Sequence, residues 1–155
     1  MGNNLMSKLI ENKTELIETV KYIAKETARL CKSIVGKSFP IKSLTIFSHD
    51  ETEYKLLFAN LQTLGDPYNY NNGPRVELFK PIVAGDNKIT HLRIRKPDME
   101  RPQVGCNDFE TDYELFKKEY LLKYPEHLEL IIRPEYEMIE FRDNKFDVLA
   151  YVVSN

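Results

Sequence analysis

Glu51-Thr52-Glu53-Tyr54-Lys55-Leu56-Leu57 recurs 59 residues later as Glu110-Thr111-Asp112-Tyr113-Glu114-Leu115-Phe116, and this repeat decides the fold expected for the chain. Four of the seven positions are identical, and a fifth keeps its negative charge. Both copies have the apolar spacing of a helix, and each follows one predicted strand and precedes three more. We therefore expect a βαβββ unit written twice, with Tyr54 and Tyr113 at equivalent points of their helices.

The segment before the first unit is predicted to be helical. Its apolar residues recur at three-, four- and seven-residue steps, the stripe of a helix with one buried face: Leu9, Leu16, Val20, Ile23, Thr27, Cys31 and Ile34. Gly36 and Pro40 end the pattern. A weak point at Asn12-Lys13-Thr14 leaves open whether this segment is one helix or two.

After Pro40 the spacing of the apolar residues changes from the helical period to alternation, and this change predicts the later elements. Alternating or β-rich stretches predict strands over 43–47, 75–79, 88–95, 104–109, 128–132, 137–142 and 146–153. Capping-box spacing predicts that the two repeated helices begin at Ser48 and at Thr111. The Pro- and Asn-rich stretch 67–74 is predicted to be a turn.

Together these elements predict an α+β fold in a single domain over residues 1–155. An N-terminal helical segment (1–38) precedes two tandem βαβββ units (41–96 and 102–154), which form a curved mixed sheet.

Composition excludes several classes of function. Twenty-two basic and 24 acidic residues leave a net charge of −2, so no global field favours nucleic acid or an anionic membrane. The apolar runs are too short to span a bilayer, and the N-terminus lacks the apolar core of a signal peptide. Two cysteines cannot form a disulfide framework. We expect a cytoplasmic protein that is a monomer or a homodimer.

The tandem arrangement resembles the vicinal oxygen chelate fold of glyoxalases and extradiol dioxygenases. The closing run 138–149 is similar to the final hairpin of that superfamily. More narrowly, residues 72–80 and the surroundings of Pro97 resemble the small bacterial YecM family, which carries an extra N-terminal helix. The resemblance covers residues 5–153.

The resemblance implies a cup between the two units in which a divalent metal polarises a substrate. In the superfamily, a histidine comes from the first strand of each unit and carboxylates come from later strands. The matching histidine positions fall near Ser43 and Gln103, and the matching acidic position is Arg95. The usual metal ligands are therefore missing, and we expect no cofactor, with a divalent metal as the alternative.

His91, Arg93 and Arg95 alternate with Leu92 and Ile94 on one predicted strand and so share one face. The apolar pair suits the helix side of the sheet, which would turn the other three toward the cup. The same pattern fits a half-solvated edge strand, and residues 93–96 with Arg101 also fit a solvated charge run. Both interpretations stay open at this point.

Glu135, Glu137 and Glu140 come from strands that would face the second half of the cup. Glu137 and Glu140 cannot share a face, because residues on one face of a strand are two apart. Glu140 with His91 would hold a metal if one is bound. The alternative is that these acids pair with Arg133 and Arg142 on the surface.

The other reactive residues favour structural roles. His49 lies at a helix N-terminus and His127 in a loop, so a capping role and a solvated one are expected. Cys106 has no histidine close in sequence, so an inert thiol is expected.

Three hypotheses follow. The first is a vicinal-oxygen-chelate-fold protein whose cup binds a small organic anion through Arg93, Arg95 and His91, with Glu137 and Glu140 nearby. The second is a metal-dependent lyase, isomerase or dioxygenase of the same fold. The third is a non-catalytic interaction domain. Whether the chain is an enzyme stays open, because fold alone does not determine function.

Overall fold

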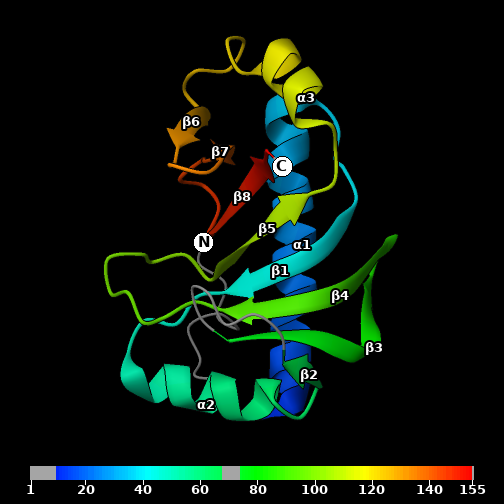
Figure 1. Cartoon of the computed structure of the whole chain (residues 1–155), viewed down its shortest axis with the longest axis vertical. Helices are drawn as coiled ribbons and strands as arrows, with labels where there is room; N and C mark the ends of the chain where they lie inside the picture. Colours follow the sequence, from blue (N-terminus) through cyan, green and yellow to red (C-terminus); the bar gives the residue numbers. More distant parts are fainter. Residues whose placement is uncertain (1–9, 68–73, 155) are drawn as a thin grey trace.

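The computed structural model describes residues 10–67 and 74–154, in which three helices and eight strands form an α+β structure (Figure 1). In chain order the elements are α1 (Lys13–Val35), β1 (Ile41–Ile46), α2 (Glu51–Leu61), β2 (Gly65–Pro67), β3 (Arg75–Ala84), β4 (Asn87–Ile94), β5 (Gly105–Phe109), α3 (Tyr113–Tyr120), β6 (Leu128–Ile132), β7 (Glu137–Phe141) and β8 (Val148–Val153). The prediction of an α+β fold with an N-terminal helix and a mixed sheet is confirmed.

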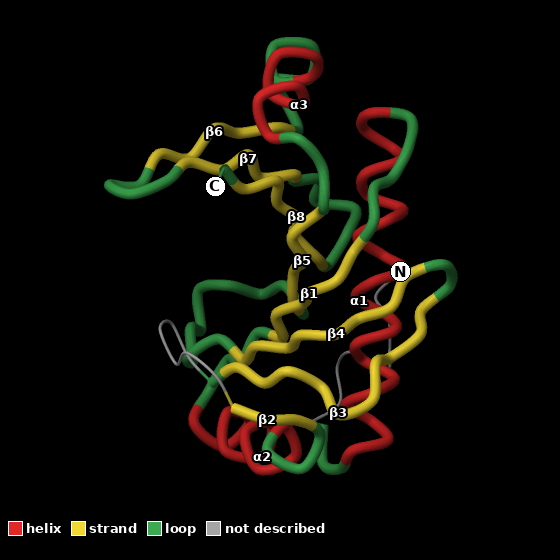
Figure 2. The backbone as a smooth tube through the Cα atoms, turned by 45° about the vertical axis from the view of Figure 1, so that its right-hand side comes forward, coloured by secondary structure: helices red, strands yellow, loops and turns green. Residues whose placement is uncertain are grey.

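All eight strands belong to one sheet in the order β2-β3-β4-β1-β5-β8-β7-β6 (Figure 2). β1 is parallel to β4 and β5 is parallel to β8, while every other neighbouring pair is antiparallel. β1 and β5 meet in the middle of the sheet. β4 and β5 therefore lie on either side of β1, with which both pair.

α1 covers one face of this sheet as a continuous helix. The Asn12 side chain caps it by accepting a 2.9 Å hydrogen bond from the Glu15 amide, and Gly36 ends it with φ +90°. The weak point at Asn12-Lys13-Thr14 is thus the start of the helix. Leu9 and the residues before it lie outside the described part of the chain.

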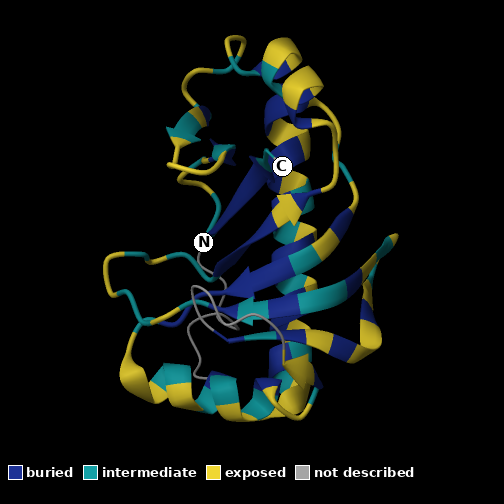
Figure 3. Cartoon of the chain, viewed as in Figure 1, coloured by how far each residue is buried: buried dark blue, intermediate teal, exposed yellow. Residues whose placement is uncertain are grey.

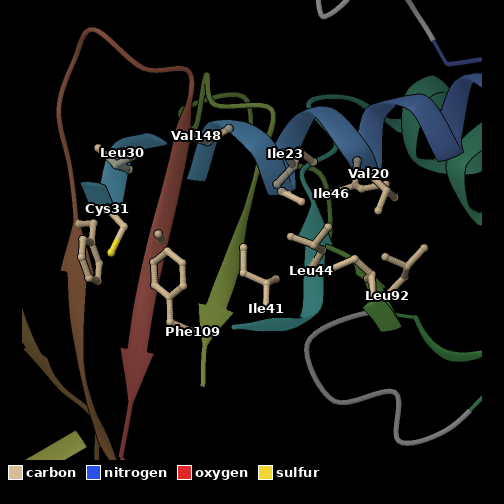
Figure 4. Packing of buried hydrophobic residues seen from close by; sticks show 14 of the residues in the cluster. Val20, Ile23, Leu30, Cys31, Ile41, Leu44, Ile46, Leu92, Phe109 and Val148 are labelled. Atoms are coloured by element: carbon tan, nitrogen blue, oxygen red, sulfur yellow. The ribbon is translucent and has the colours of Figure 1, made fainter. Parts of the chain in front are cut away.

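The main core lies between α1 and the sheet. Figure 4 shows Val20 and Ile23 of α1 packed toward Leu44 and Ile46 of β1. Buried residues dominate the central strands β1, β5 and β8, whereas α2 keeps an exposed outer side (Figure 3). Because strand residues alternate between faces, the neighbours of these core residues lie on the face turned away from α1.

The repeated helices begin later than the capping-box spacing predicts. The N-caps are Asp50 and Asp112, whose side chains accept from the amides three residues on, at 2.8 and 2.9 Å. Aspartate is at least as good a cap as serine or threonine, so the predicted starts were wrong by two residues and one residue. Tyr54 is the fourth residue of α2, whereas Tyr113 is the first residue of α3, so the two differ in their position relative to the start of the helix.

Two strands also differ from expectation. β2 is a short strand that the sequence pattern did not predict, and it pairs with β3 through Pro67 and Val76. β3 runs on to Ala84, with a register shift between Glu77 and Ile82 that accommodates Pro81. Most of the predicted turn at 67–74 lies outside the described residues. No helix in the described ranges is long and apolar enough to cross a membrane.

Candidate functional site

A cavity of about 930 Å³ opens on the face of the sheet turned away from α1. It is bordered by β3, β4, the segment after β4, β5, β8 and the turn between β6 and β7. Its lining residues, which define the main cavity, are Arg75, Arg93, Arg95, Lys96, Pro97, Asp98, Cys106, Asp108, Arg133, Glu135, Tyr136, Met138, Tyr151, Val153 and Ser154.

Arg93 and Arg95 line this cavity because Leu92 and Ile94, between and beside them on the strand, are buried in the core against α1. Arg93 Nε donates a 3.2 Å hydrogen bond to Thr45 Oγ1, which orients its guanidinium. Arg95 lies just after β4, with its guanidinium 5.0 Å from the centre of the Phe47 ring. These two arginines are the sequence-predicted residues that the structure brings together.

Arg75 is a third cavity arginine, which the sequence analysis missed. Arg75 and Arg93 are Cα partners on β3 and β4, so their side chains leave the sheet next to each other. Arg75 Nε is buried and has no hydrogen-bond partner among the described residues. The sequence pattern placed Arg75 on the strand face opposite Val76 and Leu78, but it did not show that Arg75 would lie beside Arg93.

Asp108 is a carboxylate that lines the same cavity and feels the charges of Arg93 and Arg75, and it too was missed. It lies on β5 between the buried Cys106 and the end of the strand, in the alternation that turns Asn107 and Phe109 toward α1. Desolvation by the surrounding protein raises the pKa of Asp108, although its side chain still reaches the solvent of the cavity. The positive charges of Arg93 and Arg75 oppose this shift and favour the ionised form.

His91 lines a smaller hollow of about 80 Å³ beside the main cavity. This side hollow shares Arg75, Arg93 and Asp108 with the main cavity. The Nδ1 atom of His91 lies 2.8 Å from the Thr90 hydroxyl. His91 thus lies on the predicted face of β4, but it lines the side hollow and not the main cavity.

Glu140 does not line either hollow, which corrects its prediction as a ligand-binding residue. Its side chain is buried and accepts a 2.6 Å hydrogen bond from the Tyr151 hydroxyl. Arg142 donates to its other oxygen, and Arg101 lies 3.9 Å away. A carboxylate with both oxygens engaged and no solvent access is a structural anchor rather than a ligand contact.

Glu137 lies on the opposite face of β7, so the expectation that it enters the cup is wrong. Its Oε1 atom accepts hydrogen bonds from Lys117 at 2.6 Å and from the Tyr113 hydroxyl at 2.7 Å, both on α3. Both bonds lower the pKa of Glu137, and the bond from Lys117 has the larger effect. The acid that does line the main cavity from this region is Glu135.

The donor set does not fit the metal that the resemblance implies. His91 on β4 and Glu140 on β7 are four strands apart, at about 4.8 Å per strand and so about 19 Å along the sheet. Zinc ligands must lie about 2.0–2.3 Å from one ion. Across residues 10–67 and 74–154, no three His, Cys, Asp or Glu side chains are grouped to hold an ion. The predicted alternative pair is therefore wrong.

The remaining histidines have local roles. His49 Nδ1 lies 2.8 Å from Glu53 Oε1, and its Nε2 lies 2.9 Å from the Gln103 carbonyl oxygen. Because both partners accept hydrogen bonds, this ring ties the start of α2 to the segment before β5. His127 Nδ1 lies 3.0 Å from the Arg142 carbonyl oxygen, at a half-buried position away from the cavity.

Cys106 lies at the floor of the main cavity as a protonated thiol. Burial, with a smaller effect of Asp108, raises its pKa to about 12. The thiolate needed for nucleophilic attack is therefore scarce at neutral pH. Burial likewise raises the pKa of Cys31 to about 12, and both cysteines are free.

The main cavity has an apolar wall on the side of the C-terminal strands. Phe47, Cys106, Leu149 and Tyr151 form a second buried cluster on this face of the sheet. Ile131, Met138 and Val153 pack against it. The cavity therefore has a cationic wall, on β3 and β4, and an apolar wall, on β7 and β8, that is bordered by Arg133, Glu135 and Ser154.

Comparison with known proteins finds a solved structure with a similar fold. No protein-family model and no curated protein matches this chain. A solved structure described as "Structural Genomics, Protein EC4020" has a TM-score of 0.62 and 12% sequence identity. The alignment covers 98% of this chain and 92% of that one. At this identity the likeness shows a shared fold and carries no activity across.

Proposed function

We propose that this chain is a vicinal-oxygen-chelate-fold protein of YecM type that binds a small organic anion in its main cavity. The observation that carries the proposal is the grouping of three guanidiniums, those of Arg75, Arg93 and Arg95, on one wall. With Lys96 and Arg133 the lining has five cationic side chains, against the three acids Asp98, Asp108 and Glu135. The cavity thus has a net positive charge in a chain whose net charge is negative.

An anion suits this wall for two reasons. Neighbouring guanidiniums repel each other in a partly desolvated cavity, so an anion between them removes an unfavourable interaction. A planar carboxylate also offers each guanidinium a bidentate pair of hydrogen bonds. The buried, unpartnered Nε of Arg75 provides one donor for such a bond.

The tandem-unit origin of the cavity is part of this proposal. The strand order supports it, because the first strand of each proposed unit lies parallel to the last strand of the same unit. The offset of 59 residues between the two sequence copies also separates Ile46 from Gly105, which are Cα partners on β1 and β5. A twofold axis relating the units would pass between such equivalent residues.

Binding without a metal of the usual set is the form we propose, since the described donors do not fit one. The protein would act in the cytoplasm, as a monomer or a homodimer, in keeping with its two free thiols.

Thermal unfolding with small carboxylic acids, each compared with its uncharged amide, tests the proposal. A ligand at 100 times its dissociation constant stabilises by about 2.7 kcal/mol, a rise in Tm of roughly 5–10 °C for a chain of this length. Only the acids should produce this rise, and Arg93→Gln should abolish it. Arg29→Gln, on the solvent side of α1, is the matched control.

Two results would contradict the proposal. One is that no acid shifts the Tm of the wild type. The other is that Arg93→Gln responds to the acids as the wild type and the Arg29→Gln control do, which would leave the arginines as a solvated charge run.

A further inference from the structure

We infer that the ligand of the main cavity is a free α-amino acid with an apolar side chain, an inference that rests on the proposed function. The arginine wall alone would suit any carboxylate. Asp108 makes the difference, because it places a carboxylate beside Arg75 and Arg93 in both hollows. A ligand that bridges these groups needs a negative end and a hydrogen-bond-donating, positive end.

The three side chains are near one another without being paired. The charges of Arg93 and Arg75 act on the carboxyl of Asp108. Yet in the described part of the chain no ion pair of 4.0 Å or less joins Asp108 to either arginine. Glu140, by contrast, is closed off by Arg142 and Tyr151. The charges around Asp108 are therefore arranged around a gap rather than closed on each other.

An α-amino acid matches this gap in charge. Its carboxylate and ammonium groups are attached to the same carbon, so one can meet the arginines while the other meets Asp108. A simple carboxylate would meet repulsion from Asp108, and a simple amine would meet repulsion from the arginines. The zwitterion satisfies both sides.

The apolar wall provides the place for the amino acid's side chain. Cys106 and Tyr151 belong to both the cavity lining and the buried apolar cluster, and Met138 and Val153 extend this wall. A side chain attached to the same carbon would lie across these residues and leave water.

Calorimetric titration with three related probes tests the inference. L-phenylalanine carries both charged groups, 3-phenylpropionate lacks the amine and L-phenylalaninamide lacks the carboxylate. A hydrogen bond to a charged group predicts that phenylalanine binds about tenfold to hundredfold tighter than 3-phenylpropionate. The amide should bind weakest of the three. L-leucine and 4-methylpentanoate repeat the first comparison with an aliphatic side chain.

Variants locate the effect. Asp108→Asn should remove the advantage of phenylalanine and leave 3-phenylpropionate bound as well as before or better, because the repulsion is gone. Asp86→Asn, in the exposed turn between β3 and β4, is the matched control and should behave as the wild type. The wild-type comparison needs no variant, so it stands even where Asp108→Asn fails to fold.

Failure of the amino-acid inference can be distinguished from failure of the proposed function. If 3-phenylpropionate and 4-methylpentanoate bind the wild type as tightly as the amino acids, the inference is wrong while the anion site stands. An unchanged preference in Asp108→Asn would also overturn it. If neither the acids nor the amino acids bind, the proposed function fails with it.

Discussion

Glu140 and Tyr151 are Cα partners on β7 and β8, and the Tyr151 hydroxyl donates a 2.6 Å hydrogen bond to Glu140 Oε2. Arg142 donates a hydrogen bond to the other oxygen of this carboxylate. Arg101, in the segment between β4 and β5, lies 3.9 Å from Glu140 Oε2. This buried acid therefore links the segment that borders the main cavity to β7. It stabilises the cavity's shape without entering it.

The first prediction concerns this bond. Tyr151→Phe leaves a buried carboxylate oxygen without its closest donor, and we expect a loss of about 1.5–3 kcal/mol in the free energy of unfolding. Urea denaturation measures it. Tyr136→Phe is the control, because Tyr136 lines the same cavity but is exposed and its hydroxyl has no hydrogen bond within the described ranges. Equal stability of the two variants would contradict the assigned role of Tyr151.

The second prediction concerns pH. Lys117 and Tyr113 lower the folded pKa of Glu137 below its ordinary value of 4.5. The unfolded state therefore binds the proton more readily, so Glu137 stabilises the fold fully above about pH 4.5. This contribution is lost as the pH falls through the lower, folded pKa.

Glu137→Gln should accordingly be less stable than the wild type at neutral pH. The gap between their free energies of unfolding should narrow below about pH 4.5. Denaturant unfolding from pH 7 to pH 3 measures the gap. Glu126→Gln replaces an exposed acid that has no ion pair or side-chain hydrogen bond within the described part of the chain, and it should show no such narrowing. A gap that stays constant to pH 3 would be incompatible with a lowered pKa.

The third prediction concerns the centre of the sheet. A Cβ at Gly105 would overlap the Thr45 carbonyl oxygen and lie 2.6 Å from Ile23 Cδ1 of α1. We expect Gly105→Ala to cost about 1–3 kcal/mol or more, because neither the strand nor the helix can give way easily. Thermal unfolding measures the loss.

Gly85→Ala separates this packing effect from a backbone effect. Gly85 has φ +60° but nothing within 4 Å of an added Cβ, so its substitution costs only the left-handed conformation, about 1 kcal/mol. Gly105→Ala should be the more damaging of the two. The reverse order would mean that α1 and β1 are not packed as closely as the structure shows.

The fourth prediction concerns metal content. The purified protein should carry less than a stoichiometric amount of Zn, Mn, Fe or Ni, because the described side chains offer no group of three suitable donors. Elemental analysis measures this directly. One equivalent of metal that disappears on replacing His91 or Glu140 would support the metal-dependent enzyme instead.

The local pattern of the sequence was enough to predict most elements and one wall of the site. The apolar spacing of residues 16–34 predicts α1, and the alternation around Leu92 and Ile94 predicts that Arg93 leaves the sheet on the other face. These features depend only on residues a few positions apart, because helix and strand periods act over that range.

Only the tertiary structure decided which side chains meet. Arg75 joins Arg93 because β3 and β4 form a hairpin in which the two residues are in register, and Asp108 lies near them because β1 pairs with both β4 and β5, which brings distant parts of the chain together. The pairing of β7 with β8 places the buried Glu140 beside Tyr151, and Glu137, on the other face of β7, meets Tyr113 of α3. Strand order and register arise from the packing of the whole sheet on α1, so no local period encodes them.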